Sequence, residues 1–381
     1  MMAVTVESLH GRVLDVDSNE FIPVGRWVDL YGKRVEKLVE TSALVVAAAG
    51  GFDESASDSG EITPESVWVT KGSAAPGSSD LDRRPAVLDM MGISRQLVYP
   101  SMGLIALIEA LGGLGFTPST EESRATAWAA LDAVNEWAAE RTNKCPDRLR
   151  YVGILASAKP GATPEWMATE TERLIAAGLK AVLIPTGVPP SGLLPSDAAL
   201  DPFYATLADA GVPLLAHPPC GMGYVSDAWM RLDPLVIGSS HAPIENFVRS
   251  MTLGGVFERH PTLRFGAIKT GAWWIGALAD YMDFAVDESR TVGQFHSGGS
   301  LSLRPSEYLA RNVRVTPFNF EPVDTYFERY PQLSELYCYS THYPDPTGGE
   351  WSLRRFHEIV VPVGDEAVEK FFCTNAELLL P

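Results

Sequence analysis

The protein has 381 residues, of which 46% are hydrophobic and 20% charged, and its formal net charge is −18. A chain of this length can bury one large core, while the acidic surplus excludes the basic surface that nucleic-acid binding requires. No apolar run approaches the roughly 18 residues that cross a bilayer, and the four separated cysteines favour reduced thiols. We therefore expect a cytoplasmic protein that binds a small molecule and neither nucleic acid nor membrane.

Short apolar runs that end in polar or turn residues alternate with amphipathic runs along the chain. This alternation predicts a parallel sheet built from βα units. Polar residues follow nearly every predicted strand, which favours a TIM barrel over an open sheet, because all strand ends of a barrel converge on one mouth. We predict a single α/β barrel domain over residues 1–381. The predicted strands cover 13–16, 96–99, 151–155, 180–184, 212–216, 264–268 and 336–339, and the predicted helices cover 120–141, 164–177, 201–210, 244–257 and 367–372.

Two regions interrupt this rhythm, residues 43–85 and a long loop over 187–196 that contains Pro-Pro-Ser-Gly. Residues 50–60 and 71–82 are rich in Gly, Ser, Ala and Asp, and they flank a short strand-like run over 66–70. Because turn-forming residues of this kind are typical of loops, we interpret residues 43–85 as an insertion that lies over the barrel mouth.

The first predicted strand runs into three polar residues. Side chains alternate along a strand, so Asp17 and Asn19 are expected to share the face that points into the barrel, and Glu20 can turn inward where the strand ends. Carboxylate and amide oxygens here are candidate metal ligands. The alternative is a turn or a helix N-cap, where Asp and Asn are common.

Histidines follow later strands. His217 ends an apolar run, His241 precedes a predicted helix, and His342 follows the last predicted strand with Asp345 three residues on. Each histidine taken alone could be a hydrogen-bonded core or helix-start residue. Together they would place imidazoles and carboxylates at one mouth, and mixed N/O sets suit Zn, Fe or Mn.

Segments spread over almost the whole chain resemble family 2 of the amidohydrolase superfamily. This group contains aminocarboxymuconate semialdehyde decarboxylase, resorcylate-type decarboxylases and assorted hydrolases. The resemblance implies a distorted (β/α)₈ TIM barrel with a metal at the C-terminal strand ends, and it places His217 at a family ligand position. The similar segments are Leu-Asp-Val-Asp-Ser-Asn-Glu at 14–20, Pro-Leu-Leu-Ala-His-Pro at 213–218, the stretch 254–266, Gly-Ala-Trp at 271–273, Thr-His-Tyr-Pro-Asp-Pro at 341–346 and Asn-Ala at 375–376.

The chain departs from the family pattern at several positions. Asp17 and Asn19 stand where relatives carry His-x-His or an acid followed by His, and His342 stands where relatives carry the metal-binding aspartate. Lys269 replaces a glutamate of close relatives. We therefore expect a rearranged, oxygen-richer ligand set that holds one or two ions of iron or zinc, with manganese as a third option. The expected ligands are Asp17, Asn19, Glu20, His217, His241, His342 and Asp345.

Our leading functional hypothesis is hydrolysis of an acyl bond by metal-activated water. Asp345 or Glu20 would take and return the proton, and Lys269 would stabilise the oxyanion. A similarity to the diiron thioesterase branch of diterpenoid antibiotic biosynthesis implies a coenzyme A thioester as substrate. The alternatives are non-oxidative decarboxylation of an aromatic or unsaturated acid, and a non-catalytic binding protein. We further expect a homo-oligomer, namely a dimer, and a bulky apolar acid bound by Trp27, Met102, Trp273 and Tyr343.

Overall fold

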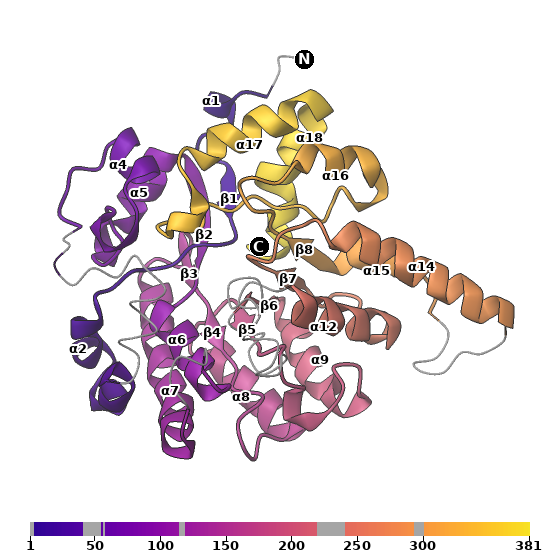
Figure 1. The fold of residues 1–381 in the computed structure, drawn as a ribbon, viewed down its shortest axis with the longest axis horizontal. Helices are drawn as coiled ribbons and strands as arrows, with labels where there is room; N and C mark the ends of the chain where they lie inside the picture. Colours follow the sequence, from indigo (N-terminus) through magenta and orange to yellow (C-terminus); the bar gives the residue numbers. More distant parts are fainter. Residues whose placement is uncertain (1–3, 41–54, 56–57, 114–118, 219–240, 293–300) are drawn as a thin grey trace.

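The computed structural model describes residues 4–40, 55, 58–113, 119–218, 241–292 and 301–381. Eight short strands lie in parallel at the centre, and helices surround them (Figure 1). Strands β1, β2 and β3 form one sheet, and β4 to β8 form another in chain order. Every residue of β1, β6, β7 and β8 is buried, as expected of parallel strands covered on both faces. The strands are Val13–Asp15 (β1), Ile93–Val98 (β2), Leu149–Tyr151 (β3), Gly153–Ile154 (β4), Val182–Leu183 (β5), Leu214–Ala216 (β6), Phe265–Ala267 (β7) and Val313–Val315 (β8).

The two sheets are joined where β3 runs into β4. The Val152 amide donates to the Val98 carbonyl (2.9 Å), whereas the Gly153 amide donates to the Ala181 carbonyl (2.9 Å). The strand thus changes partner between two consecutive residues. A Cβ at Gly153 would meet Leu179 Cδ1 at 2.7 Å, so a larger residue at the change of partner would require the Leu179 side chain to move.

The barrel is closed between β8 and β1 by an extended segment, residues 336–343, which we call the closing segment. The Val315 amide donates to the Leu336 carbonyl (2.8 Å) on one side. On the other side the His342 amide donates to the Asp17 carbonyl (2.9 Å), and the Asn19 amide donates to the Tyr343 carbonyl (2.8 Å). Together with the family match reported below, this closure supports the predicted TIM barrel.

The helices form the outer layer, and some of them begin at a residue whose side chain satisfies one of the first amides. Thr120 and Thr163 accept hydrogen bonds from the third helical residue of α7 and α8. The helices are Val6–Leu9 (α1), Trp27–Tyr31 (α2), Pro64–Val69 (α4), Arg84–Met91 (α5), Ser101–Ala110 (α6), Glu121–Lys144 (α7), Pro164–Ala176 (α8), Asp201–Ala210 (α9), Ala242–Leu253 (α12), Val256–Arg259 (α13), Ile275–Val292 (α14), Pro305–Asn312 (α15), Val323–Arg329 (α16), Ser352–Val360 (α17) and Asp365–Glu369 (α18).

Three parts of the strand prediction need correction. The run 336–339 is not a regular strand and contains only an isolated bridge at Tyr337. The run 66–70 is not a strand but lies largely in α4, whose start is fixed by a Thr63–Ser66 capping box and by Pro64 in the first turn. Strand β8 was not predicted, because Val-Arg-Val is short and carries a central arginine. The structure buries that arginine, Arg314, by letting its guanidinium donate to the Asn375 carbonyl (2.9 Å).

Within the predicted insertion over 43–85, the structure describes Ser55 and residues 58–85. Residues 43–54, 56 and 57 lie outside the described part. Its described portion lies against the ends of β1 and of the closing segment. The Gly72 amide donates to the Pro344 carbonyl (2.8 Å), and the Phe21 amide donates to the Ser78 carbonyl (2.8 Å). This portion therefore lies beside the ends of β1 and of the closing segment, and the insertion as a whole stays a prediction.

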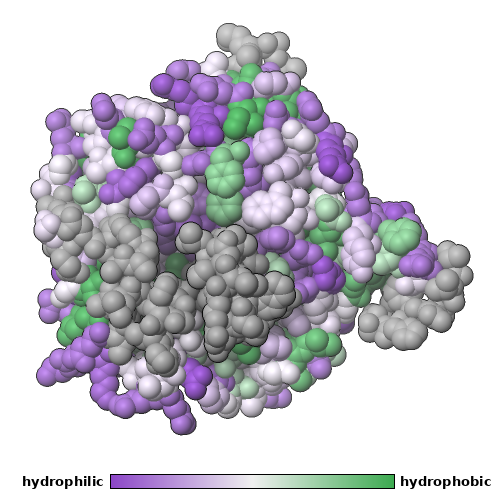
Figure 2. Space-filling model, in the orientation of Figure 1, coloured by the Kyte–Doolittle hydropathy of each residue, from purple (hydrophilic) through white to green (hydrophobic). Residues whose placement is uncertain are grey.

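The visible surface agrees with the acidic composition. Outside the grey regions, Figure 2 shows mostly hydrophilic side chains and only small, separate hydrophobic patches on this face. Among the described helices, none is both long and apolar enough to cross a membrane.

Candidate active site

Three polar side chains from distant parts of the sequence meet at the barrel mouth. Asp17 follows β1, His217 follows β6, and His342 lies in the closing segment. His342 Nδ1 lies 3.0 Å from one carboxylate oxygen of Asp17, and His217 Nε2 lies 3.9 Å from the other. None of the three is more than 2% exposed. We call these residues the Asp17 cluster.

The Asp17 cluster is short of hydrogen-bond partners. Within the described structure, both carboxylate oxygens of Asp17 and all four ring nitrogens of His217 and His342 are buried without a hydrogen bond, and so is Asn19 Oδ1. Leaving such groups unpaired costs about 1–3 kcal/mol each, so their concentration at one place needs an explanation.

A divalent metal is one such explanation, because two imidazoles and a carboxylate form a donor set typical of Zn, Fe or Mn. No group of three or more His, Cys, Asp or Glu in the described residues is spaced as a coordination shell around an ion. The unpaired atoms show, however, that the chemistry of the donors fits an ion, and Asp17, His217 and His342 are the residues that would hold it.

Burial fixes the protonation of this cluster. It lowers the pKa of His217 well below the usual value and that of His342 to about 3, and the Lys269 charge adds to both effects. Burial raises the pKa of Asp17 to about 8, against the opposing charge of Lys269. Both imidazoles are therefore neutral near pH 7, which is the form that ligates metals.

An ion pair lies beside the Asp17 cluster. Lys269 Nζ contacts Asp345 Oδ2 at 2.7 Å, and Asp345 also accepts hydrogen bonds from the Thr347 amide (2.8 Å) and hydroxyl (2.6 Å). Burial by itself would raise the pKa of Asp345, but Lys269 and these hydrogen bonds hold it well below the usual range. The opposing carboxylates likewise outweigh burial and raise the pKa of Lys269. Asp345 is thus an ionised carboxylate and a weak base, and its role as the residue that takes and returns the proton stays a prediction.

Two of the four non-glycine residues with positive φ in the described structure lie at this place. Lys269 and His342 have φ values of 57° and 53°, in the left-handed region that non-glycine residues rarely adopt. Each such residue costs of order 1 kcal/mol, and strain of this kind gathers at functional sites. The strain is consistent with a functional role for both side chains.

The structure separates Glu20 from the Asp17 cluster. Both of its carboxylate oxygens accept the Ser101 amide hydrogen bond (2.9 and 2.8 Å), so Glu20 caps the N-terminus of α6. The adjacent Asn19 donates from its amide nitrogen to the Tyr99 carbonyl (3.3 Å). Its oxygen Oδ1 has no hydrogen-bond partner and could therefore ligate a metal. Glu20 thus stabilises a helix from a remote segment, which is neither the turn nor the local N-cap considered as the alternative. Its role as ligand or base stays a prediction without support from the geometry.

Replacement of Glu20 by glutamine is expected to change the pH dependence of stability. Burial raises the pKa of Glu20 to about 7 from an ordinary 4.5, although its hydrogen bonds to Ser101 oppose the shift. The folded state therefore holds this proton more tightly than the unfolded state, and stability falls as pH rises from about 4.5 to 7. The free energy of unfolding is measured by chemical denaturation in EDTA at pH 5 and at pH 7.5. Its decrease between the two pH values should be smaller in E20Q than in the unmodified protein, by up to about 3 kcal/mol. Equal declines in both proteins would contradict the assignment.

His241 lies outside the Asp17 cluster. Its Nε2 pairs with Glu245 Oε2 at 3.2 Å one turn along α12, and its ring lies 5.2 Å from Trp273 and 5.8 Å from Trp274. These side chains line an open cavity of about 440 Å³ between α12 and α14. Within the described residues no contact joins His241 to Asp17, so the helix-start alternative describes its observed position.

The four residues expected to bind the substrate fall into two groups. Trp27 and Met102 are fully buried, and the Trp27 indole donates to the Ile22 carbonyl (2.9 Å), so both pack in the core. Tyr343 is also buried, and its hydroxyl donates to the Pro76 carbonyl (2.6 Å). Trp273 is 46% exposed and is joined to His342 through the ring of Phe318 by centroid distances of 6.1 and 6.0 Å. Of the four, Trp273 remains the best candidate for contact with a substrate.

Comparison with known sequences identifies the family. The sequence model of the amidohydrolase family matches residues 103–381, which is more than half of the chain. The chain belongs to this amidohydrolase family. The match confirms the resemblance found in the sequence, and it includes His217, Lys269 and His342. No curated protein matches the chain.

Solved structures agree on the fold. An amidohydrolase from Mycobacterium avium subsp. paratuberculosis is 21% identical, with a TM-score of 0.67 over 97% of this chain and 99% of its own. A 5-carboxyvanillate decarboxylase from Novosphingobium aromaticivorans, complexed with manganese and 4-hydroxy-3-methoxy-5-nitrobenzoic acid, is 20% identical over 97% and 96%, with a TM-score of 0.63. A 2,6-dihydroxybenzoate decarboxylase from Rhizobium is 15% identical over 97% and 98%, with a TM-score of 0.61. At these identities the likeness shows the barrel fold.

Sequence reasoning about this amidohydrolase missed several residues that support the site. Thr316 Oγ1 accepts the Lys269 amide (2.7 Å), and Glu321 accepts the Ala272 amide (2.8 Å) beside the exposed Trp273. Asp15 and Arg84 are fully buried charges close to Asp17 and Tyr343. A buried charge leaves little trace in a single sequence, although Asp15 stands two residues before Asp17 in a strand that is otherwise apolar.

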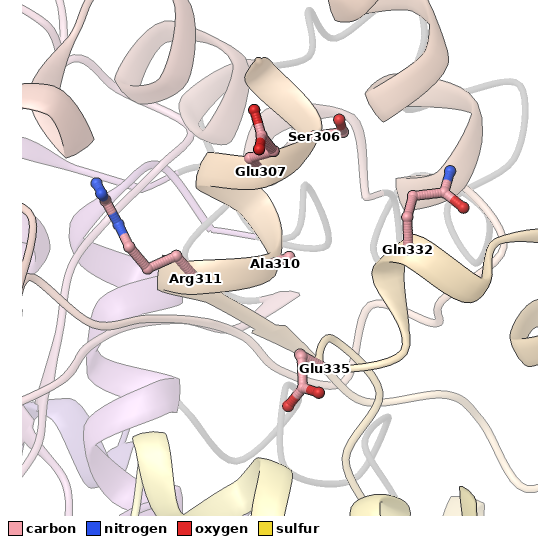
Figure 3. A pocket seen from close by; sticks show the side chains of 6 residues that line it. All are labelled: Ser306, Glu307, Ala310, Arg311, Gln332 and Glu335. Carbon is pink, nitrogen blue, oxygen red and sulfur yellow. The ribbon is translucent and has the colours of Figure 1, made fainter. Parts of the chain in front are cut away.

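A separate shallow cavity of about 300 Å³ lies between α15 and the short helix Pro331–Leu333. In Figure 3 the Arg311 side chain points away from Gln332, and the remaining labelled residues are Ser306, Glu307, Ala310 and Glu335. None of the predicted site residues of this amidohydrolase lines it.

Proposed function

We propose that this amidohydrolase is a metal-dependent decarboxylase of an aromatic or unsaturated acid. The observation that carries the proposal is the Asp17 cluster beside the Lys269–Asp345 ion pair. Three donors suffice for one ion, and with one divalent ion the five charges of the site do not cancel. With the ion bound, Asp17 would be an ionised ligand in spite of its raised pKa, because a metal binds the deprotonated carboxylate. Asp17 and Asp345 then contribute two negative charges, whereas Lys269 and the ion contribute three positive ones. One net positive charge in a buried site is complementary to a single substrate carboxylate.

The supposed ion and the residues have different tasks. A divalent ion, when bound, acts as a Lewis acid that orients a carboxylate or activates water. The manganese of the structurally similar 5-carboxyvanillate decarboxylase supports manganese as the first metal to test, ahead of the iron and zinc expected from the sequence.

Lys269 would supply the proton. When the bond to the carboxylate breaks, its electron pair stays on the substrate carbon, and carbon dioxide leaves. That carbon then takes a proton from the Lys269 ammonium, because a carbanion is far more basic than an amine. Asp345 keeps Lys269 protonated until that moment, and exchange with solvent restores the proton afterwards.

Acyl hydrolysis is the second candidate, and Asn19 is the observation that favours it. The unpaired Oδ1 of Asn19 is an oxygen donor from the same segment as Asp17, so the described residues contain part of a second ligand set. Two ions would leave a surplus of three positive charges, which suits activation of water more than binding of one carboxylate. In that case Lys269 would stabilise the oxyanion of an ester or a thioester.

Loading the protein with manganese is expected to produce carbon dioxide from a hydroxybenzoate, and EDTA is expected to abolish the release. The measurement runs a panel of hydroxybenzoates and a panel of acyl thioesters side by side, recording carbon dioxide and free thiol. Bulk metal analysis counts the ions per chain.

Thiol release without carbon dioxide, with two ions per chain, would replace decarboxylation by hydrolysis. Full activity in EDTA, from a protein without metal, would refute both candidates.

A further inference from the structure

A chain of buried hydrogen bonds lies beneath the Asp17 cluster. The Arg84 Nε donates to Gln96 Oε1 (3.0 Å), and Gln96 Nε2 donates to Asp15 Oδ2 (2.6 Å). The Thr341 hydroxyl donates to the same oxygen of Asp15 (2.6 Å). None of these four side chains is more than 2% exposed. The chain thus joins α5, β2, β1 and the closing segment inside the barrel.

Two residues of this hydrogen-bonded series, Asp15 and Arg84, also contact the backbone at or beside the candidate ligands. Asp15 Oδ1 accepts the amides of Asp17 (3.2 Å) and Thr341 (2.9 Å). The guanidinium of Arg84 donates to the carbonyls of Asn19 (2.9 Å) and Tyr343 (3.2 Å). The residues that carry Asp17 and His342 are therefore tied to one another through Asp15 below and through Arg84 beside them.

Asp15 cannot itself serve as a ligand while these bonds are made. A carboxylate offers about four acceptor positions, and Asp15 accepts four hydrogen bonds, two on each oxygen. A fully buried carboxylate of this kind is expensive, and a purely structural role could be filled by apolar side chains at lower cost. The four hydrogen bonds come from the segment that bears Asp17, from the closing segment that bears His342, and from Gln96 in β2.

We propose that Asp15 and Gln96 are positioning residues that set the separation of Asp17 and His342 for a divalent ion. The inference rests on the metal dependence proposed above. Loss of one hydrogen bond to Asp15 would let the closing segment shift against β1. Residues that hydrogen-bond to metal ligands typically contribute about 10–100-fold to metal affinity.

The test exchanges the two functional groups. In Asp15→Asn, one carboxylate oxygen becomes an amide that faces the Gln96 amide and the Thr341 hydroxyl, so at least one donor loses its acceptor. We expect Mn²⁺ affinity, measured by electron paramagnetic resonance and by calorimetry, to fall about 10–100-fold. In the double variant Asp15→Asn/Gln96→Glu, the new amide donates to a carboxylate that also pairs with Arg84, and the net charge is unchanged. This variant should recover most of the lost affinity.

Two further variants separate positioning from general damage to the fold. Asn312→Ala removes another buried side chain, one that donates to the Pro261 and Leu263 carbonyls, and it should lower stability without changing Mn²⁺ affinity. Thr341→Val replaces the hydroxyl by a methyl group, which removes the hydrogen bond to Asp15 and the acceptor of the Tyr343 amide. It tests the link between Asp15 and the closing segment if Asp15→Asn does not fold, and it too should weaken Mn²⁺ binding.

The outcomes are distinct. An unmodified protein that binds no Mn²⁺ or other divalent ion would overturn the proposed function. Unchanged affinity in folded Asp15→Asn, or in Thr341→Val if the first does not fold, would overturn the positioning role alone. A double variant no better than the single one would also overturn it, because the loss would then reflect damage to the fold and not the hydrogen-bond pattern.

Discussion

Replacement of His342 by alanine is expected to abolish metal-dependent activity. His342 supplies one of two neutral imidazoles in the Asp17 cluster, with its Nδ1 3.0 Å from Asp17. Metal affinity should therefore fall by more than the roughly 10–100-fold that removal of an outer partner costs. Alanine meets the same backbone strain at φ 53° as histidine does, so the substitution tests the imidazole and not the conformation. Metal analysis and turnover are measured on the same sample.

The matched control is His10→Ala, because His10 is exposed and lies outside the barrel mouth. It should keep both metal and activity. If His342→Ala retained full metal content and turnover, His342 would not be a ligand, and the unpaired nitrogens would need a different explanation.

Replacement of Lys269 by methionine should lower kcat/KM by about 10²–10³-fold, the size of effect seen when a preorganised charge is removed from an active site. Asp345 would lose its cation, so the pKa of Asp345 should rise towards its ordinary value. The uncompensated carboxylate should also cost about 1–3 kcal/mol of stability, moderated by its partial exposure. Steady-state kinetics and denaturant unfolding measure the two effects separately.

A second substitution distinguishes chemistry from stability. Lys269→Met/Asp345→Asn removes both charges and should recover stability while activity stays low. Lys180→Met is the control, because Lys180 is exposed and precedes β5, at the end of the barrel opposite to the mouth. Activity restored by the double variant would show that Lys269 only neutralises Asp345 and donates no proton.

The sequence predicted the barrel because its signal is local. The alternation of apolar strands and amphipathic helices covers most of the chain, and α9 begins and ends at the predicted residues. Strand β8 was not predicted, because three residues with a central arginine are too few to show an alternation of apolar and polar side chains. The run 66–70 was assigned wrongly because its apolar residues outweighed the capping signals at Thr63 and Pro64.

The site was predicted in part. Position after a strand was enough to bring Asp17, His217 and His342 together, since parallel strand ends converge. It failed for Glu20 and His241, because a residue near a strand end can turn either way. The choice depended on partners supplied by remote segments, the Ser101 amide for Glu20 and Glu245 for His241. Such pairings follow from three-dimensional packing that no local pattern encodes.

The way the barrel closes has a consequence for biosynthesis. Asp17 and His342 are 325 positions apart in the chain, and they meet only after the closing segment has paired with β1. During translation the first candidate ligand is exposed long before the last one has been made. Contacts of such large sequence separation form late in folding, because loop closure must precede them. The nascent protein would therefore acquire its ion only as a nearly complete polypeptide, and metal uptake would report the final stage of folding.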